Sequence, residues 1–240
     1  MKIASHQPYF FPYIGYFSLI SAVDTFIFFD ISQFNRKSWM TRNRILKPDY
    51  NWQYFNAATQ YLHVNGILTE CQLNEELAWK EKILAQLEHY KKKAKFYSET
   101  ITFISELLYG SETFLADFNV KSTIAIAKKL NIETKIYRYS EIISQVDKAE
   151  RGNLWGLNFC KAFGADTYIN APGGVELYSV DDYNDAGIKL GFIQNKLTRY
   201  SQNNENFIPG LSIIDVLMFN GFENTSNLIK DYWIDWVFNK

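Results

Sequence analysis

The loop after the first predicted strand carries the first candidate for chemistry. His6 ends that strand, and two prolines and a glycine fix the backbone between it and the next predicted helix. An imidazole titrates near neutral pH, so His6 is a candidate general base for an amine or hydroxyl nucleophile. The alternative is a structural histidine in a proline-locked turn with core aromatics. The candidate substrate contacts of this loop are Gln7, Tyr9, Gly15 and Tyr16.

A second candidate lies at the end of the next predicted strand. Asp30 closes the apolar run 25–29, and the segment 31–48 that follows it includes five basic and no acidic side chains. Arginine forks bind phosphate and a tryptophan face stacks on a ring, which predicts substrate contacts rather than duplex binding. We interpret Arg36, Lys37 and Lys47 as a solvated basic loop. The predicted contacts of this segment are Trp39, Arg42, Asn43 and Arg44.

A third group of polar residues stands near the C-terminus. Ser212 and Asp215 have the spacing of a helix cap, which is a sufficient structural explanation for Ser212. Asp215 remains open, because a first-turn carboxylate near His6 would orient the imidazole, as Asp30 also would. Tyr200 and Gln202 complete the predicted site.

These residues need a framework that brings them together. A strand over 2–5, a helix over 16–23 and a strand over 25–29 form the start of a parallel βαβ unit. In such units ligands bind at the carboxyl ends of the strands. His6 and Asp30 both fall at those ends.

The remaining pattern has a helical middle and a return to alternating strands and helices. We predict helices over 75–94, 98–109 and 112–130, then strands over 134–139, 165–170 and 187–193 with a helix over 153–163. Two C-terminal helices are predicted over 211–219 and 226–238. The expected fold is α/β, a parallel Rossmann-like (nucleotidyltransferase-like) core with a helical insertion. It divides into core residues 1–60, insertion 61–130 and core residues 131–240, in one compact unit.

Composition excludes several classes of protein. The chain of 240 residues has a net charge of −1, so no basic field indicates binding to nucleic acid or anionic membranes. Cys71 and Cys160 fit neither a zinc motif nor a disulfide framework, and three scattered histidines predict no metal site. Without a leader or an apolar span, the expected location is the cytoplasm. Aromatic residues make up 17 %, and those in the loops are candidate walls of a cleft.

Several motifs are spread along the whole chain. They are His6-Gln7-Pro8-Tyr9-x-x-Pro12-x-x-Gly15-Tyr16-Phe17, Asp24, Asp30, Gln33-Phe34, Ser38-Trp39, Arg42-Asn43-Arg44, Tyr200-x-Gln202, Phe207-x-Pro209-x-Leu211-Ser212-Ile213-Ile214-Asp215 and Asn220-Gly221. The opening and closing motifs are the most specific. Together the motifs resemble the WbqC-like protein family.

The resemblance implies a cytosolic transferase of bacterial surface-polysaccharide (O-antigen) biosynthesis. It implies transfer of an acyl or aminoacyl group, for example glycyl, to the amine of a nucleotide-linked amino sugar. No cofactor is expected to be tightly bound; the donor would be a thioester of CoA or of carrier-protein phosphopantetheine, which makes an acyl or aminoacyl carrier protein a possible partner.

Within that scheme, His6 takes the amine proton while Asp30 or Asp215 holds its ring. Asn43 and backbone N–H groups near Gly15 stabilise the oxyanion, and Arg42 holds a phosphate.

Two alternatives remain open. The opening loop also resembles the nucleotide-binding start of HIGH-type adenylyltransferases, although Tyr16 stands where their second histidine would be. A non-catalytic protein that binds sugar nucleotides in a polysaccharide assembly complex would use the same loops.

Overall fold

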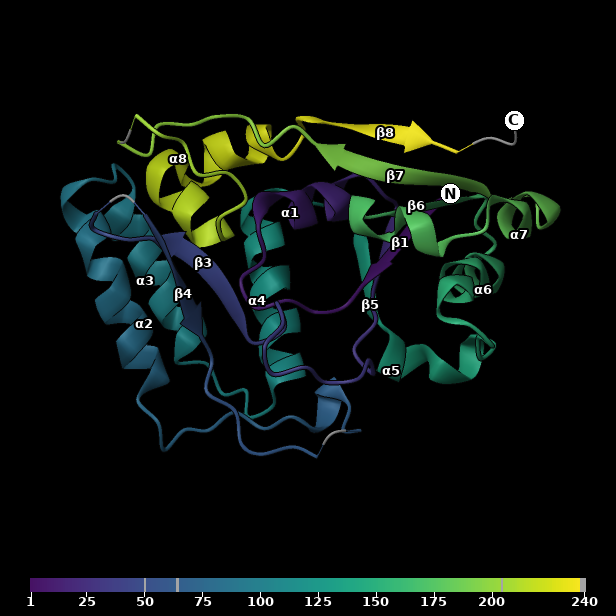
Figure 1. Cartoon of the computed structure of the whole chain (residues 1–240), viewed down its shortest axis with the longest axis horizontal. Coiled ribbons are helices and arrows are strands. Elements are labelled where there is room, and N and C mark those ends of the chain that lie inside the picture. Colours follow the sequence, from purple (N-terminus) through teal and green to yellow (C-terminus); the bar gives the residue numbers. More distant parts are fainter. Residues whose placement is uncertain (50, 64, 204, 238–240) are drawn as a thin grey trace.

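A six-stranded sheet with strand order β5-β2-β1-β6-β7-β8 forms the centre of the molecule (Figure 1). We describe residues 1–49, 51–63, 65–203 and 205–237 from a computed structural model. The neighbours from β5 to β7 pair in parallel, whereas β8 runs antiparallel to β7. The predicted α/β class with a parallel Rossmann-like core is therefore confirmed. The strands are β1 (Lys2–His6), β2 (Thr25–Phe28), β5 (Lys135–Arg138), β6 (Thr167–Asn170), β7 (Lys189–Asn195) and β8 (Tyr232–Trp236).

The predicted strand–helix–strand start is present as β1, α1 (Ile14–Ser21) and β2. Successive side chains of a strand point to opposite faces of the sheet. Ile3 accordingly packs into one hydrophobic cluster and Ala4 into the other, and Ile27 alternates in the same way with its phenylalanine neighbours. Both faces of these strands are buried, which explains their short, continuous apolar runs.

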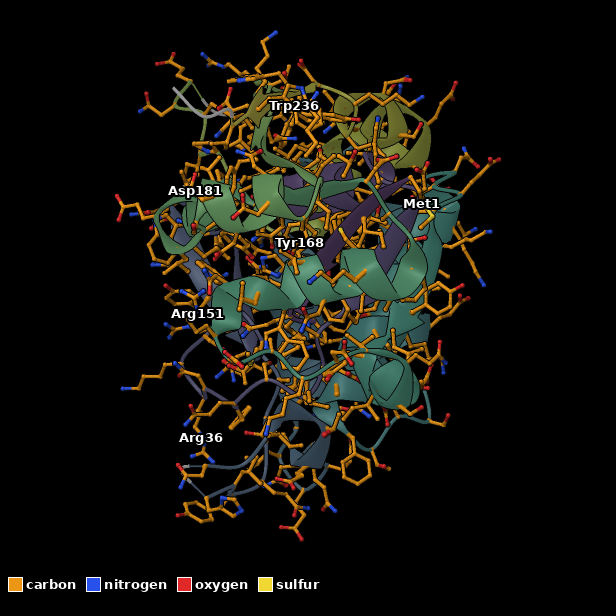
Figure 2. All side chains as sticks on the ribbon, turned by 90° about the vertical axis from the view of Figure 1, so that its right-hand side faces the viewer. Met1, Arg36, Arg151, Tyr168, Asp181 and Trp236 are labelled. Atoms are coloured by element: carbon orange, nitrogen blue, oxygen red, sulfur yellow. The ribbon has the colours of Figure 1, made fainter. Side chains whose placement is uncertain are left out.

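Helices cover the two faces of the sheet. On one face lie α1 and α4 (Leu115–Lys129), and on the other α5 (Tyr139–Ile142), α6 (Trp155–Phe163) and α7 (Val180–Asp185) (Figure 1). Figure 2 looks onto the second face, where Tyr168 of β6 lies between Trp236 at one end and Arg36 at the other.

Between β2 and β5 the chain leaves the sheet and builds the lobe at the left of Figure 1. The lobe consists of the antiparallel hairpin β3 (Arg42–Leu46) and β4 (Trp52–Asn56) and the helices α2 (Trp79–Leu87) and α3 (Tyr97–Leu108), and α4 leads from it back along the sheet. The helices were predicted, but strand β3 was not: no strand is predicted in the basic segment that follows Asp30. Short 3₁₀ helices are η1 (Leu68–Glu70), η2 (Glu88–Lys92), η3 (Ile143–Gln145), η4 (Gly152–Leu154) and η5 (Pro172–Leu177).

The C-terminal part differs from the prediction. Helix α8 (Ile213–Leu228) packs on α3 and is interrupted at Gly221, whose φ of 67° favours glycine. A Cβ at that position would lie 2.7 Å from the Phe96 ring. The predicted helix over 226–238 is wrong: α8 ends at Leu228 and residues 232–236 form β8, while Phe238 lies outside the described residues.

The strand order has a reversal point that predicts where a ligand binds. From β1 the chain adds β2 and then β5 on one side, and later β6 and β7 on the other. Open α/β sheets bind ligands outside the carboxyl ends of the strands at such a point. Here the two ends are His6 of β1 and Asn170 of β6.

Candidate functional site

Buried polar side chains hold the loop after β1 in place. Asn43 Nδ2 donates to the carbonyls of Phe10 (3.2 Å) and Phe11 (2.9 Å), and Ser212 Oγ donates to the second of these (2.7 Å). Asn119, which sequence reasoning missed, donates to the Pro8 carbonyl at 3.1 Å. Phe11 has a φ of 40°, an unfavourable conformation for a non-glycine residue that these bonds stabilise. Asn43 and Ser212 thus shape the loop, and the amide predicted to hold an oxyanion is committed to carbonyl groups.

The imidazole of His6 has a defined orientation in this loop. Its ring lies edge-on to Tyr9 at 4.7 Å and to Tyr16 at 5.1 Å between centroids. Nδ1 lies 3.2 Å from the carbonyl oxygen of Gln7, which only accepts hydrogen bonds. We therefore assign the proton to Nδ1, which leaves the Nε2 lone pair to accept another. Burial lowers the pKa of His6 below its usual value of 6.5, so the ring is neutral at pH 7.

Tyr16 supports His6 rather than contacting a ligand. The Tyr16 side chain is only 2 % exposed, and its hydroxyl donates to the Gln7 carbonyl at 2.8 Å. Gly15 lies in the first turn of α1, where a Cβ would come within 2.4 Å of the Tyr13 ring. Both predicted substrate contacts therefore have structural roles.

His6 faces a cleft at the strand-order reversal point. This His6 cleft, of about 530 Å³, is formed by the ends of β1 and β6 together with the loops after β6 and before α6. Its walls include Phe29, Trp155 and Tyr178, and Gly173 and Gly174 border it. Sequence reasoning missed Trp155 and Tyr178; the rule that ligands bind beyond the carboxyl ends of neighbouring strands would have pointed to the loop that holds Tyr178.

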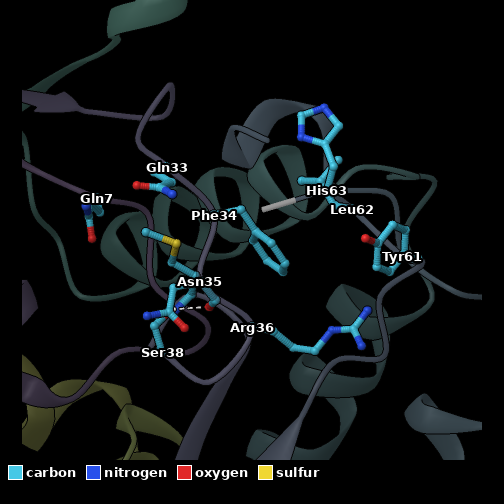
Figure 3. Close-up of a pocket in the computed structure, with 10 residues that line it drawn as sticks. Gln7, Gln33, Phe34, Asn35, Arg36, Ser38, Tyr61, Leu62 and His63 are labelled. Atoms are coloured by element: carbon cyan, nitrogen blue, oxygen red, sulfur yellow. Dashed lines mark hydrogen bonds between the residues drawn. The ribbon is translucent and has the colours of Figure 1, made fainter. Parts of the chain in front are cut away.

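Two further hollows share a residue with the His6 cleft. The Arg36 hollow, about 710 Å³, lies between segments 33–40 and 61–63 and shares Gln7 (Figure 3). The Arg44 hollow, about 200 Å³, shares Tyr9. It is lined by Tyr9, Tyr13, Trp39, Asn43, Arg44 and Gly210. Gln7 thus borders the His6 cleft and the Arg36 hollow, and Tyr9 borders the His6 cleft and the Arg44 hollow.

Arg44 and Arg42, predicted together, have different surroundings. The Arg44 guanidinium lies between Trp39 (5.6 Å) and Trp52 (5.2 Å) and donates to the Gly210 carbonyl at 3.1 Å. Arg42 instead packs at 4.1 Å over the Tyr54 ring. The alternation of side chains along β3 explains why Arg42 and Arg44 share one face while Asn43 is buried between them.

The structure gives Asp215 partners other than His6. Its carboxylate is fully buried and accepts from the hydroxyls of Tyr90 (2.5 Å) and Tyr200 (2.6 Å) and from Gln202 Nε2 (3.2 Å). Gln202 also bonds the backbone of Ile208 in both directions. These residues tie the polar loop before α8 to the lobe, so the predicted roles of Asp215 in orienting His6 and of Tyr200 and Gln202 in binding substrate have no support in this geometry.

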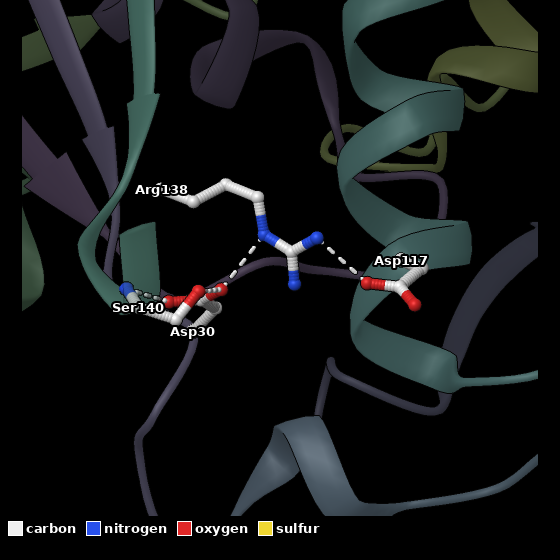
Figure 4. Close-up of polar contacts among 4 residues, drawn as sticks. All are labelled: Asp30, Asp117, Arg138 and Ser140. Carbon is white, nitrogen blue, oxygen red and sulfur yellow. Dashed lines mark hydrogen bonds and ion pairs between the residues drawn. The ribbon is translucent and has the colours of Figure 1, made fainter. Parts of the chain in front are cut away.

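Asp30 likewise pairs elsewhere (Figure 4). Its buried carboxylate accepts from Arg138 Nε (2.8 Å), Ser140 Oγ (2.6 Å) and the Ser140 backbone N–H (2.9 Å). Arg138 Nη1 also donates to Asp117 at 2.7 Å. Asp30 therefore fastens the end of β2 to β5 and α5, and the ring of His6 is held by a backbone carbonyl rather than by either predicted carboxylate.

The buried carboxyl of Asp215 predicts a pH-dependent stability. Burial raises its pKa from 3.8 to about 6, so the folded state binds a proton more tightly than the unfolded state. The stability that this proton contributes is present at acidic pH and is lost as pH rises through about 6. We expect the advantage in unfolding free energy of wild type over Asp215→Asn to fall by roughly 2 kcal/mol between pH 4 and pH 7.

Denaturant unfolding at several pH values measures this difference. Tyr200→Phe keeps the Asp215 carboxyl but removes a hydrogen bond that lowers its pKa. The pKa of Asp215 should therefore rise further, and the loss of stability between pH 4 and pH 7 should be larger than in wild type. A wild-type advantage that stays constant with pH would contradict the prediction.

The described residues also bear on metal, membrane and thiol chemistry. There, neither a cluster of His, Cys, Asp and Glu suited to a metal nor a helix long and apolar enough to cross a membrane is found. Cys71 and Cys160 are free and buried, and burial raises their pKa values to about 11 and about 12. Neither thiol is set up as a nucleophile.

Comparisons with known proteins agree with the motifs. An uncharacterized protein of Mycobacterium tuberculosis, Rv1507c, is 27 % identical over 228 residues, which cover 92 % of this chain and 95 % of the relative. No solved structure matches the chain significantly. The model of the WbqC-like protein family matches residues 7–227, nearly the whole length. The chain therefore belongs to the WbqC-like protein family.

Proposed function

We propose that this protein is a cytosolic transferase that moves an acyl or aminoacyl group from a thioester to the amine of a nucleotide-linked amino sugar. Its place would be the biosynthesis of a bacterial surface polysaccharide such as O-antigen. The observation that carries the proposal is the neutral His6 ring, with Nδ1 bound to a carbonyl and Nε2 left as a base, in a cleft at the reversal point of the sheet.

A base of this kind suits an amine nucleophile. The sugar ammonium group first loses one proton to give the free amine. The amine attacks the thioester carbonyl, the N–C bond forms and the C–S bond breaks. His6 Nε2 takes the second amine proton and passes it to the departing thiolate. Because neither cysteine is activated, direct attack is favoured over an acyl-enzyme intermediate.

The two hollows that adjoin the His6 cleft support a reaction of two substrates. Gln7 and Tyr9 each line the His6 cleft and a neighbouring hollow, so acceptor and donor can reach the same point from different sides. Aromatic walls suit sugars, whose C–H faces stack on rings, and the His6 cleft has Tyr9, Trp155 and Tyr178.

A mass-spectrometric transfer assay tests the proposal. Purified protein is incubated with pairs of UDP-, dTDP- or GDP-linked amino sugars and acyl or aminoacyl thioesters of CoA, and each acceptor is examined for the mass of the added group. We expect turnover with at least one pair and none with the matching sugar that carries a hydroxyl in place of the amine. Binding of sugar nucleotides without turnover over the whole panel would favour a binding protein, and turnover of ATP with Mg²⁺ would favour nucleotidyl transfer; either result would overturn the proposal.

A further inference from the structure

The Arg36 hollow differs in charge from the cleft it adjoins. Among the described residues, the lining of the His6 cleft includes no Lys, Arg, Asp or Glu. The Arg36 hollow has a guanidinium and an imidazole, Arg36 and His63, and no carboxylate in its described lining. An anionic portion of a ligand is therefore stabilised in the second space and not in the first.

Arg36 is exposed and contacts the facing segment of the hollow. Its Nη2 donates to the Gln60 carbonyl at 3.2 Å, and its own carbonyl accepts from Thr41 Oγ1 at 2.5 Å. The Phe34 N–H donates to the Gly66 carbonyl at 2.9 Å, which joins the two loops that enclose the hollow. Figure 3 shows the guanidinium extending between them. The remaining N–H groups of the guanidinium can bind a phosphate.

Two rings at this hollow offer a stacking surface. Tyr61 is 82 % exposed, an unusual state for a large aromatic side chain, and Phe34 lies across the space from it (Figure 3). Every nucleobase has a π-face, and base–aromatic stacking tolerates different bases.

We propose that the Arg36 hollow binds the nucleoside diphosphate portion of the acceptor, with the diphosphate at Arg36 and the base against Tyr61. The attached sugar then passes Gln7, which lines both spaces, and enters the uncharged His6 cleft with its amine toward Nε2. This inference rests on the proposed function for the identity of the acceptor. It gives Arg36, first interpreted as part of a solvated loop, a role in recognition.

Calorimetric titration with UDP, dTDP and GDP tests the assignment without any turnover. We expect at least one nucleotide to bind wild type and Arg36→Gln to weaken it about 10-fold or more, as for loss of a hydrogen bond to a charged group. Tyr61→Ala should weaken binding by a similar factor. Lys37→Gln is the matched control, because it removes the same charge from the next, exposed residue.

The outcomes separate this inference from the proposed function. His6→Asn should bind the nucleotide as wild type does, which places the nucleotide away from the base. If transfer occurs but Arg36→Gln binds as tightly as wild type, the diphosphate lies elsewhere and only this inference is overturned. If Arg36→Gln weakens binding but no transfer is found, the inference stands and the transferase fails. Equal losses in Arg36→Gln and Lys37→Gln would show a diffuse charge effect and would overturn the site.

Discussion

His6→Asn is expected to lower the rate of transfer by about 100- to 10,000-fold, the usual contribution of a general base. An asparagine amide can still donate to the Gln7 carbonyl as Nδ1 does, so the loop keeps its anchor while the base at Nε2 is lost. His6→Gln removes the base as well but places its amide nearer to the Nε2 position. We therefore expect both variants to lose turnover and to keep nucleotide affinity within a few-fold of wild type.

The pH profile gives this prediction a second readout. Because burial lowers the pKa of His6 below 6.5, the protonated, inactive ring forms only at more acidic pH. The acid side of the kcat/KM profile should then include an ionisation below pH 6.5 that is absent from the residual activity of His6→Asn, whereas the ionisation of the acceptor amine remains in both. The same shift means that acid destabilises the fold through His6, since the unfolded state takes up the proton first.

His89 offers a matched control for the loss of an imidazole. It lies in η2, where its Nδ1 is 2.8 Å from the Gln86 carbonyl and its ring contacts Tyr90, outside the three hollows described above. His89→Gln should leave turnover within a few-fold of wild type. Undiminished transfer by folded His6→Asn and His6→Gln would remove His6 from the mechanism.

The elements that were predicted correctly have patterns that local sequence can carry. The run around Phe26 and the short strand before His6 are apolar on both faces, because helices cover both faces of a parallel sheet. Their order with α1 between them fixes a βαβ unit, and the reversal point follows once β6 is placed. The position of His6 at a ligand-binding edge could therefore be predicted.

Strands β3 and β8 were not predicted, because their residues do not show a clear two-residue alternation of apolar and polar side chains. In β3 the inward position next to Ile45 is Asn43, an amide that satisfies loop carbonyls, so the alternation of apolar residues is broken. In β8, Trp233 and Trp236 also fit a helical spacing. Residues 232–236 form a strand because they pair with β7, and this pairing overrides the local helical propensity.

The predicted site residues also fall into two groups, those placed by their local position in the chain and those whose role depends on distant partners. Gln7, Tyr9, Trp39 and Arg44 line the hollows, since each is near a strand end or on the hairpin beside the loop. The roles of Asp30 and Asp215 depended on which distant residue each carboxylate meets. Spacing along the chain cannot supply that information, whereas the folded structure pairs them with Arg138 and with two tyrosines.

Asp30→Asn is expected to lower the unfolding free energy by about 3–5 kcal/mol, as for removal of one partner of a buried ion pair. Both oxygens of the carboxylate accept hydrogen bonds, from Ser140 N–H on one side and from Arg138 Nε and Ser140 Oγ on the other. An amide NH₂ in either orientation would face an N–H donor, so the substitution adds a repulsion to the lost charge.

Asp117→Asn is the matched control, because it removes a carboxylate from the same arginine at a site that is 41 % exposed. An exposed pair contributes about 1 kcal/mol or less, so denaturant midpoints should separate the two variants clearly. Measured at a temperature where it is folded, Asp30→Asn should retain transfer within a few-fold of wild type, since its carboxylate fastens β2 to β5. A folded Asp30→Asn with normal stability and a 100-fold loss of turnover would instead return Asp30 to the catalytic residues.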